Sequence, residues 1–589
     1  MFQVSLRRSF APSAVLGILT FIVQIPYVVR GFDLHHNGLM LAQTIAVRDG
    51  LSIHSEVFSQ YGPLTTWAQM SLFLLPTEPA IGLKYWAAIV TSLIFFLLSD
   101  LGRFSQKALG LSRRGTTVGA VIWFFSSPSF ASGPPLAWSS LFGSLLLTAS
   151  FYLFVKAVSS GGRSGLSRTG CFVASGFMVG LVPFARINVG ASAVVLSIVV
   201  VVGLGFVMRV LVRDWVKAYL LGLTVGVAAP LIALALSGSI IDYFQQSVIS
   251  PLRWSQDASG GVLASLGGIL GEISEIAAPV FLPILLGVSL LALASRRGVR
   301  HEAPVRRAIA LLSIPAFAVA LIMLITNGRL VGSLGATNRA QLLPRILEAW
   351  GSWDQQFLLT QFAISGLLSI AGVIYGVWGH SNGKIGQHRL AGIVLLATMN
   401  VASFSQLHPT YDARHLWWGA VFASLTILSS LSFVTFERKF QSLALAGISV
   451  ITILSAVIGS AGYLSGSFRK ADAQGIFSGL LLNDDEYSLI TGLENMFEDE
   501  LPDGQNALFF VGDGGVSVVT GSFRSDSKNF VLWAYQQPRD ALAAVSDGSF
   551  LVVSSGSLDA LGYESFDQLK STNSFERLAC TSARDAIPL

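Results

Sequence analysis

The sequence predicts a mainly α-helical protein, in which a polytopic bundle of transmembrane helices is followed by a small α/β domain. Of its 589 residues, 52% are hydrophobic and only 12% are charged, whereas soluble globular proteins carry about a quarter charged residues. Apolar runs also recur along residues 1–464 at lengths close to the roughly 20 residues that cross a hydrocarbon core. Finally, the basic residues gather in alternate connections between those runs.

The apolar runs define about 13 candidate spans, and internal glycine or proline does not exclude a span because neighbouring helices satisfy the freed backbone groups. In chain order the candidates are Ser13–Val29, Leu83–Leu101, Val118–Ala131, Leu136–Val155, Cys171–Phe184, Ala191–Met208, Ala218–Leu236, Ile276–Ala294, Ala308–Ile325, Leu358–Val377, Leu390–Phe404, Leu416–Val434 and Leu443–Leu464.

The basic residues orient this bundle. Every second connection is the basic one, as in Arg113–Arg114 and Arg296–Arg297, and the connections between them are poor in lysine and arginine. Cytoplasmic loops of membrane proteins carry such an excess of positive charge. The pattern therefore predicts an N-in, C-out chain that starts with an uncleaved signal-anchor.

The chain changes character after the last span, which divides it into a transmembrane domain at 1–464 and an extracytoplasmic α/β domain at 465–589. In the second part acidic residues outnumber basic ones, and short β-rich runs alternate with helical patches. The expected strands are Ala507–Val511, Val516–Thr520, Phe530–Ala534 and Phe550–Ser554, and the expected helices are Asp485–Met496 and Ser565–Leu569. Such a domain covers the active face, binds a polymeric acceptor, or braces the bundle.

Several function classes find no support in the sequence. There is no P-loop, HExxH or CxxC pattern, and the two cysteines, Cys171 and Cys580, give no disulfide framework. We therefore expect no ATP hydrolysis and no nucleic-acid partner.

The connection after the first span, Gly31–Leu64, is dense in groups that lipid cannot solvate. Ionisable residues close to the membrane are functional candidates because their burial is costly. Asp33, just past the end of the first span, is placed to take a proton from an incoming hydroxyl as a general base. The alternative is an interfacial aspartate that caps a helix starting near Leu39.

This connection resembles the first extracytoplasmic loop of the GT-C superfamily of polyprenyl-phosphate-sugar-dependent glycosyltransferases. In that superfamily an acidic residue is followed by an amphipathic helix, a small-residue turn, an aromatic-Gly/Pro-Pro-Leu element and a further surface helix. Those parts correspond here to Asp33, Asn37–Gly50, Leu51–Gln60, Tyr61-Gly62-Pro63-Leu64 and Thr65–Leu75. The resemblance implies a substrate-binding role for Gln60 and Tyr61, and it extends to the number of spans and the soluble C-terminal domain.

One departure from the superfamily concerns the acid. Many members have two neighbouring acidic residues, whereas this chain has Asp33-Leu34-His35-His36-Asn37. A divalent metal is thus compatible with the resemblance but not supported by a paired-acid motif, and no cofactor is predicted with certainty. His35 and His36 are candidate proton carriers or phosphate contacts, because histidine titrates near neutral pH. The alternative is a pair of structural, hydrogen-bonded histidines.

Two further groups of candidates lie on other outer connections. The late connection Gln406–Trp418 contains polar and charged residues that suit phosphate binding, with arginine as the bidentate donor: His408, Tyr411, Asp412, Arg414 and His415. The alternative there is an Asp412–Arg414 pair with interfacial tryptophans Trp417 and Trp418. Arg186 lies between two short apolar runs without a nearby acid, and an arginine at that depth requires an anion.

The sequence and the resemblance together predict a glycosyltransferase in the plasma membrane of a bacterium. It would move a sugar from a polyprenyl-phosphate donor to an extracytoplasmic acceptor, with inversion and with Asp33 as the base. The alternatives are a polymerase or ligase of lipid-linked glycans, which would use the histidines and Arg414, and a secondary transporter or flippase. Transporters often contain inverted repeats, and none is visible here.

Overall fold

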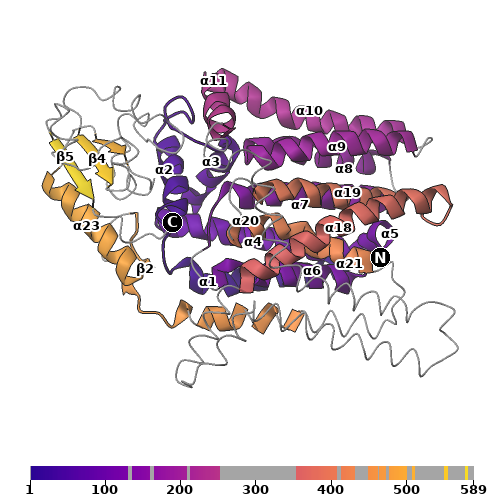
Figure 1. Ribbon diagram of the computed structural model, residues 1–589, viewed down its shortest axis with the longest axis horizontal. Coiled ribbons are helices and arrows are strands. Elements are labelled where there is room, and N and C mark those ends of the chain that lie inside the picture. The colour runs from indigo at the N-terminus through magenta and orange to yellow at the C-terminus, as the bar shows by residue number, and fades with distance from the viewer. Residues whose placement is uncertain are drawn as a thin grey trace, which may run out of the picture.

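The structure is a computed structural model, and Figure 1 shows it as a bundle of long helices. It describes residues 2–130, 135–159, 165–207, 212–252, 353–407, 413–431, 449–450, 452–454, 456–461, 463–471, 476–500, 507–510, 550–554 and 577–581.

The helices before residue 253 follow one another with short connections. They are α1 (Phe2–Val28), α2 (His36–Arg48), α3 (Pro63–Gln69), η1 (Met70–Leu74), α4 (Pro79–Asp100), η2 (Leu101–Arg103), α5 (Ser105–Leu109), α6 (Arg113–Phe125), η3 (Pro128–Phe130), α7 (Ser139–Ser159), α8 (Gly165–Leu181), η4 (Val182–Phe184), α9 (Ile187–Val207), α10 (Val212–Leu236), α11 (Ile240–Phe244) and the π-helix η5 (Gln245–Ile249).

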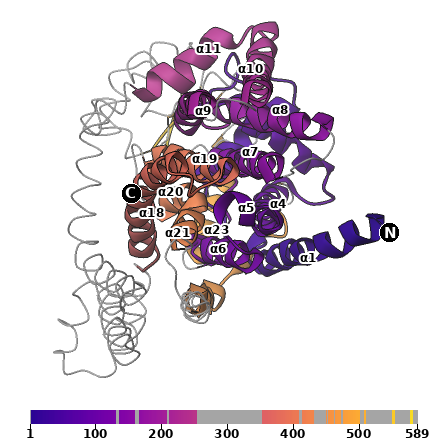
Figure 2. The same ribbon diagram turned by 90° about the vertical axis from the view of Figure 1, so that its right-hand side faces the viewer.

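The later helices complete the bundle and lead into the C-terminal part. They are α18 (Trp353–Ser381), α19 (Gln387–Ser403), η9 (Phe404–Leu407), α20 (Ala413–Gly419), η10 (Ala420–Phe422), α21 (Ala423–Leu431) and α23 (Asp484–Glu500). Figure 2 looks along the bundle and shows α19 inside it, where it contacts α18, α9 and α7.

Five helices among the described residues are long and apolar enough to cross a membrane: Pro79–Arg103, Ser139–Ser159, Ile187–Phe206, Asp214–Leu236 and Leu358–Ser381. Each coincides with a span expected from the sequence. Shorter apolar helices at Pro12–Val28, Arg168–Phe184 and Thr452–Ala461 match three more expected spans. The expected spans Ile276–Ala294 and Ala308–Ile325 lie outside the described residues. The total of about 13 and the N-in, C-out orientation therefore remain predictions.

Two expected spans differ from the structure. The span expected at Val118–Ala131 is instead the helix α6, which begins earlier and ends at Phe125; a turn at Ser126 and the 3-10 helix η3 follow it. The span expected at Leu416–Val434 is divided: a 3-10 turn at Ala420–Phe422 separates α20 from α21. Apolar composition predicts where a helix lies in lipid but does not reveal such local breaks.

Close helix packing depends on glycine where α8 meets α10. A Cβ atom on Gly222 would lie 1.9 Å from the carbonyl oxygen of Val173, and one on Gly180 would lie 2.5 Å from that of Leu223. Small residues let membrane helices approach backbone to backbone, which replaces the hydrophobic driving force that lipid does not provide. Gly176–Gly180 and Gly222–Gly226 have the corresponding four-residue spacing.

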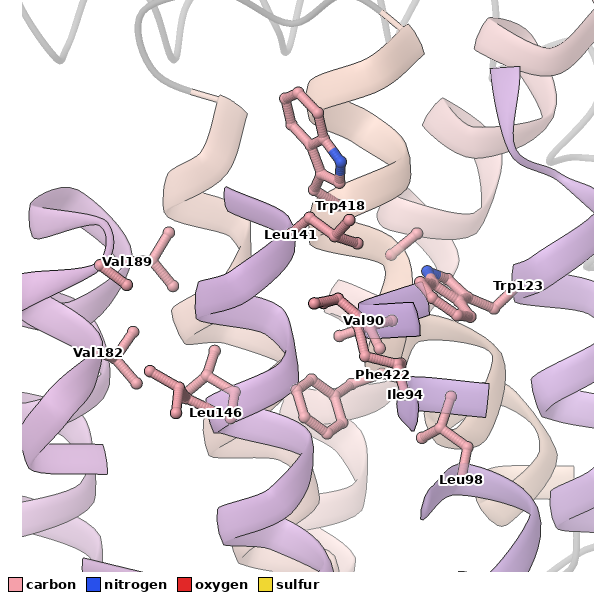
Figure 3. Packing of buried hydrophobic residues seen from close by; sticks show 14 of the residues in the cluster. Val90, Ile94, Leu98, Trp123, Leu141, Leu146, Val182, Val189, Trp418 and Phe422 are labelled. Carbon is pink, nitrogen blue, oxygen red and sulfur yellow. The ribbon is translucent and has the colours of Figure 1, made fainter. Parts of the chain in front are cut away.

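The core and the outer surface of the bundle are both apolar, as expected of a protein in lipid. Figure 3 shows part of the core, where Ile94, Leu141 and Phe422 are completely buried. On the outside, Ile18 on α1 and Val199 on α9 are more than half exposed. Apolar side chains on an outer helix face favour lipid as the surrounding solvent.

The described residues after 464 form both helix and sheet, while the separate α/β domain expected at 465–589 remains a prediction. Strands β3 (Ala507–Phe510), β4 (Phe550–Ser554) and β5 (Arg577–Thr581) form a parallel sheet in the order β3-β4-β5. The first two match expected strands and the third was not expected. The other expected elements, Val516–Thr520, Phe530–Ala534 and Ser565–Leu569, lie outside the described residues. Short strands β1 (Arg469–Lys470) and β2 (Leu481–Leu482) pair antiparallel just before α23.

Candidate active site

The polar connection after α1 is fixed by main-chain hydrogen bonds to the C-terminal part of the chain. Gly31 has φ 63°, a left-handed conformation that favours glycine. Its N–H donates to the carbonyl of Leu481 (2.7 Å), and the N–H of Leu481 donates to the carbonyl of Val29 (2.8 Å). The connection therefore leaves the end of α1 along a defined path and does not form a free loop.

Asp33 lies at the end of that path, just before α2 begins at His36. Its Oδ1 accepts a hydrogen bond from the backbone N–H of His36 (2.7 Å), and its carbonyl accepts one from the N–H of Asn37 (2.9 Å). Because the first amides of a helix have no partner inside the helix, this contact caps α2. The capping role considered as an alternative is present, although α2 starts at His36 and not near Leu39.

The same carboxylate binds Arg414, on the first turn of α20. Nη1 of Arg414 lies 3.0 Å from Oδ2 of Asp33, and Nδ1 of His36 lies 3.0 Å from the same oxygen. Burial by itself raises the pKa of the Asp33 carboxyl, but the charge and hydrogen bonds of His36 and the charge of Arg414 outweigh burial and hold the pKa below its usual range. Asp33 is thus a carboxylate whose negative charge is already balanced by neighbours.

A series of edge-on aromatic contacts connects this cluster to Tyr61. The ring of His36 packs edge-on against Trp138 (centroids 4.7 Å apart), and Trp138 packs edge-on against Tyr61 (4.8 Å). His35 packs against His36 at 4.7 Å. Trp138 is held there because Asn37 and Gln69 bind the carbonyl and amide groups of Pro135 and Ala137 just before it.

Arg186 stands on the far side of Tyr61. Its guanidinium carbon lies 4.7 Å from the centre of the Tyr61 ring, and its side chain is 8% exposed. The Tyr61 hydroxyl also contacts the amide nitrogen of Gln60. Since a cation over an aromatic face is stabilised by the ring quadrupole, Tyr61 partly replaces the anion that Arg186 requires. These contacts therefore join one cluster of expected site residues: Asp33, His35, His36, Gln60, Tyr61, Arg186 and Arg414.

The Tyr-Gly-Pro-Leu element is a point of backbone contact. A Cβ atom on Gly62 would lie 2.1 Å from the carbonyl oxygen of Phe184, so only glycine fits. Pro63 follows as the first residue of α3, where proline's fixed φ suits a helix start. Because Phe184 directly precedes the Ala185–Arg186 step, this contact sets the position of Arg186 over Tyr61.

Three buried polar atoms in this cluster have no hydrogen-bond partner in the described part of the chain. They are Oε1 of Gln60, Nε1 of Trp138 and Nε of Arg186. An unsatisfied buried polar atom costs about 1–3 kcal/mol, so a functional site is one explanation for its retention. Two donors and one acceptor in this cluster are therefore available to an oxygen-rich ligand.

Some expected site residues do not join the cluster or cannot be placed. His408, Tyr411 and Asp412 lie outside the described residues. His415 is buried and packs against Trp418 with ring centroids 5.2 Å apart. Trp417 and Trp418 are 6% and 1% exposed, so the interpretation of both as interfacial anchors is wrong. Both tryptophans lie inside the bundle, in the part of α20 from His415 to Gly419 that is buried throughout.

The loop helices agree with the expected surface helices only in part. In α2, the residues from Asn37 to Ala46 are all buried, so this part of the helix lies inside the protein and not on its surface. In α3, Thr65, Thr66 and Gln69 are buried, whereas Ser71 and Leu74 of the following 3-10 helix η1 are exposed. Polar side chains such as Gln43 and Gln69 make this burial feasible because they hydrogen-bond neighbouring carbonyls.

No three His, Cys, Asp or Glu side chains lie together as a metal site among the described residues. The cations around Asp33 are instead side chains of the protein itself.

Sequence reasoning missed three residues that shape the cluster: Trp138, Lys84 and Glu486. Trp138 falls within the expected span Leu136–Val155, and Lys84 falls within the expected span Leu83–Leu101. Lys84 is completely buried, and its Nζ donates to the carbonyls of Arg30 (2.5 Å) and Gly31 (2.6 Å). A single lysine at the start of an apolar span was the available signal, since a charge at that position requires partners.

The helices and this cluster define a polytopic membrane protein with a charged, partly unsatisfied site at one end of its bundle. No family model matches the chain, and no curated protein matches its sequence.

Solved structures do resemble it. The oligosaccharyltransferase of Archaeoglobus fulgidus, in complex with Zn and sulfate, is similar at a TM-score of 0.45 and 13% identity, over 87% of this chain and 61% of that chain. The apo form of the same enzyme is similar at a TM-score of 0.47 and 12% identity, over 87% of this chain and 64% of that chain. ArnT from Cupriavidus metallidurans, bound to undecaprenyl phosphate, is similar at a TM-score of 0.39 and 11% identity, over 88% of this chain and 87% of that chain.

This chain spans less than two thirds of the length of the oligosaccharyltransferase. Because these TM-scores lie below 0.5, the function proposed next rests on the residues of the site and not on these likenesses.

Proposed function

We propose that this chain is an integral-membrane glycosyltransferase. It transfers a hexosyl or pentosyl group from a polyprenyl-phosphate donor to a glycan, lipid or protein acceptor on the extracytoplasmic side of a bacterial plasma membrane. The observation that carries this proposal is the contact of Asp33 with Arg414 and His36, 3.0 Å each, directly after the first helix. A base and a phosphate-binding cation thus lie side by side at one end of the bundle.

The contact explains how Asp33 can be a weak base without donor and a stronger base when the donor is bound. Paired with His36 and Arg414, Asp33 has a lowered pKa and is a weak base. A donor phosphate that binds Arg414 neutralises this cation, since arginine binds phosphate strongly. The pKa of Asp33 then rises toward the range of a useful general base, at the moment when the donor is in place.

The second cation completes the phosphate site. Arg186 is buried over Tyr61 and its Nε has no partner in the described part of the chain. As the bond from the anomeric carbon to the phosphate oxygen breaks, negative charge grows on that oxygen, and preorganised donors stabilise it. Asp33 takes the proton of the acceptor hydroxyl, whose oxygen forms the new bond. Attack from the side opposite the phosphate inverts the anomeric centre.

The proposal is tested with Asp33→Asn in purified full-length protein reconstituted in lipid. A panel of undecaprenyl-phosphate hexoses and pentoses serves as donors, and membranes of the source organism serve as acceptor. We expect Asn to lower the transfer rate by about 10²–10⁴-fold, the usual contribution of a general base. Transfer by the variant at the wild-type rate would exclude Asp33 as the base.

The matched control is Asp49→Asn. Asp49 lies on the same connection and is exposed. Its Oδ1 forms an ion pair with Nε of the neighbouring Arg48 (2.8 Å). This control should retain wild-type transfer. Binding of undecaprenyl phosphate should survive in Asp33→Asn, because both arginines remain.

The same assay separates the alternatives. A ligase or polymerase would transfer only from lipid-linked oligosaccharide and not from a lipid-linked monosaccharide. A transporter or flippase would move sugar or lipid across vesicles without a covalent product. Either result, obtained with protein that binds undecaprenyl phosphate, would replace the proposed reaction.

A further inference from the structure

Glu486, on the first turn of α23, has two hydrogen-bonding tasks. Its Oε2 accepts from the backbone N–H of Asn483 (3.0 Å), while Oδ1 of Asn483 accepts from the N–H of Glu486 (2.8 Å). This reciprocal pair is a capping box, which fixes the start of the helix. A capping box needs one carboxylate oxygen of the glutamate and leaves the other available.

The other oxygen reaches a segment more than 450 positions earlier in the sequence. Oε1 of Glu486 accepts from the backbone N–H of Phe32 (3.0 Å), the residue directly before Asp33. The ring of Phe32 packs edge-on against Phe477, with centroids 5.1 Å apart. The C-terminal part of the chain thus holds both the backbone and the side chain of the residue next to the carboxylate.

Lys84 holds the same stretch from the other side. Its ammonium group binds the carbonyls of Arg30 and Gly31, and its charge acts on Glu486. The two peptide units that join Arg30, Gly31 and Phe32 are therefore fixed between Lys84 of α4 and Glu486 of α23. A carboxylate that must act at a defined atom depends on such support.

We propose that Glu486 is a positioning residue for Asp33, so that the C-terminal part of the chain sets the geometry of the base. This inference rests on the proposed function for its catalytic consequence, but the contact itself is tested without any activity. The C-terminal part of the chain then contributes to the reaction through position alone. Glu486 fixes the N–H of Phe32, and this holds the next residue, Asp33, in contact with His36 and Arg414.

Hydrogen–deuterium exchange of the full-length protein in lipid tests the contact directly. In Glu486→Ala, exchange at the Phe32 amide should accelerate by about tenfold to a hundredfold, the factor for one lost hydrogen bond to a charged group. Asp485→Ala removes a negative charge from the same helix turn, at an exposed position, and should leave this amide unchanged. Unchanged exchange at Phe32 in folded Glu486→Ala would overturn the proposal.

Glu486→Gln guards against a variant that merely unfolds α23. Its amide oxygen can still accept from Phe32, so protection of this amide should return toward wild type. Faster exchange in Glu486→Gln and Glu486→Ala alike, accompanied by equal acceleration throughout α23, would indicate a structural role only and would also overturn the proposal.

Transfer kinetics test the catalytic consequence. Glu486→Ala should lower kcat by about tenfold or more, because a misplaced base acts poorly, with little change in the KM for the donor. The groups that face Asp33 are His36 of α2, Arg414 of α20 and Glu486 of α23, with Lys84 of α4 beyond it. A displaced Asp33 loses its contacts with His36 and Arg414, which lower its pKa. The pKa of Asp33 should then rise, and the acid limb of the kcat profile should move to higher pH.

The two proposals fail separately. Accelerated exchange at Phe32 combined with full activity of Asp33→Asn would keep the contact and remove Asp33 as the base. Impaired Asp33→Asn combined with wild-type kcat and a wild-type acid limb in Glu486→Ala would keep the base and overturn the positioning role.

Discussion

Trp123 of α6 and Trp417 of α20 exchange hydrogen bonds across the bundle. Each indole N–H donates to the other residue's carbonyl, at 3.2 and 2.8 Å, and the rings stack with centroids 5.0 Å apart. This pair fixes α20 against α6. Arg414 lies three residues before Trp417, on the same short helix, so the tryptophan pair also decides where the guanidinium meets Asp33.

Replacement of Arg414 by glutamine should raise the pKa of Asp33, because one of the two cations that lower it is lost. In the wild type, the lowered pKa stabilises the fold above the unfolded value of about 3.9, and this contribution disappears as the pH falls through the folded pKa. We expect Arg414→Gln to lose about 1–3 kcal/mol at neutral pH. The acid-induced loss of stability should also be smaller and complete at a higher pH, because the folded and unfolded pKa values of Asp33 then lie closer together. Thermal unfolding at a series of acidic pH values would show this change.

Arg414→Lys is the matched variant, since it keeps the charge without the planar fork. It should retain most of the stability but bind undecaprenyl phosphate more weakly than wild type. Wild-type affinity in both variants would contradict a role of Arg414 in phosphate binding.

Trp138→Phe should separate packing from ligand binding. The indole N–H is buried and has no partner in the described part of the chain, so its removal costs the free protein little. If this N–H contacts the donor, affinity for undecaprenyl-phosphate sugar should fall by about five- to tenfold, the value of one hydrogen bond. Native mass spectrometry with titrated donor measures this change.

Trp86→Phe provides the comparison for the previous variant. Trp86 is a buried tryptophan of α4 that packs against Phe142, outside the cluster. It should leave donor affinity unchanged. Equal loss of affinity in both variants would mean that tryptophan packing, and not the Trp138 N–H, controls binding.

Gly62→Ala should destabilise the protein severely. The new methyl group would lie 2.1 Å from the Phe184 carbonyl oxygen, and backbone on both sides cannot move aside cheaply. We expect a loss above about 3 kcal/mol, the range of severe overpacking. Gly170→Ala in α8, where nothing lies within 4 Å, should be neutral or slightly stabilising. Thermal unfolding of the two variants in detergent gives the comparison.

His54 should make stability depend on pH in a second window. Burial lowers its pKa to about 4, against the opposing hydrogen bonds of Gln246 and the Ser59 backbone. Since the unfolded value is about 6.5, the stabilisation is complete above pH 6.5 and is lost as the pH falls toward 4. The loss totals roughly 3 kcal/mol, at 1.36 kcal/mol per pH unit.

His54→Asn removes this titration and keeps the backbone, because asparagine tolerates the left-handed φ of 72° found at this position. The slope of stability between pH 6.5 and 4 should flatten in the variant. A slope that persists unchanged would assign this window to other groups.

Local sequence patterns predicted the membrane helices well and the site only in part. The expected span Leu83–Leu101 lies within an observed apolar helix, and the expected span Leu136–Val155 overlaps most of another, Ser139–Ser159, because hydropathy acts on each segment separately. Asp33 and Arg186 were likewise recognisable as charged groups next to apolar runs, and His36 and Tyr61 as polar groups of the connection Gly31–Leu64. Their neighbours were not recognisable, since Trp138 looked like any core tryptophan.

The sequence by itself determined that lipid surrounds this chain, where most of its helices run, and that its polar groups collect in connections. Only the tertiary structure decided that Asp33 meets Arg414, 381 positions later, and that Glu486 holds the residue before it. The reason is physical: hydropathy and helical periodicity depend on neighbours along the chain. An ion pair depends instead on how separate helices pack, and no local pattern records that packing.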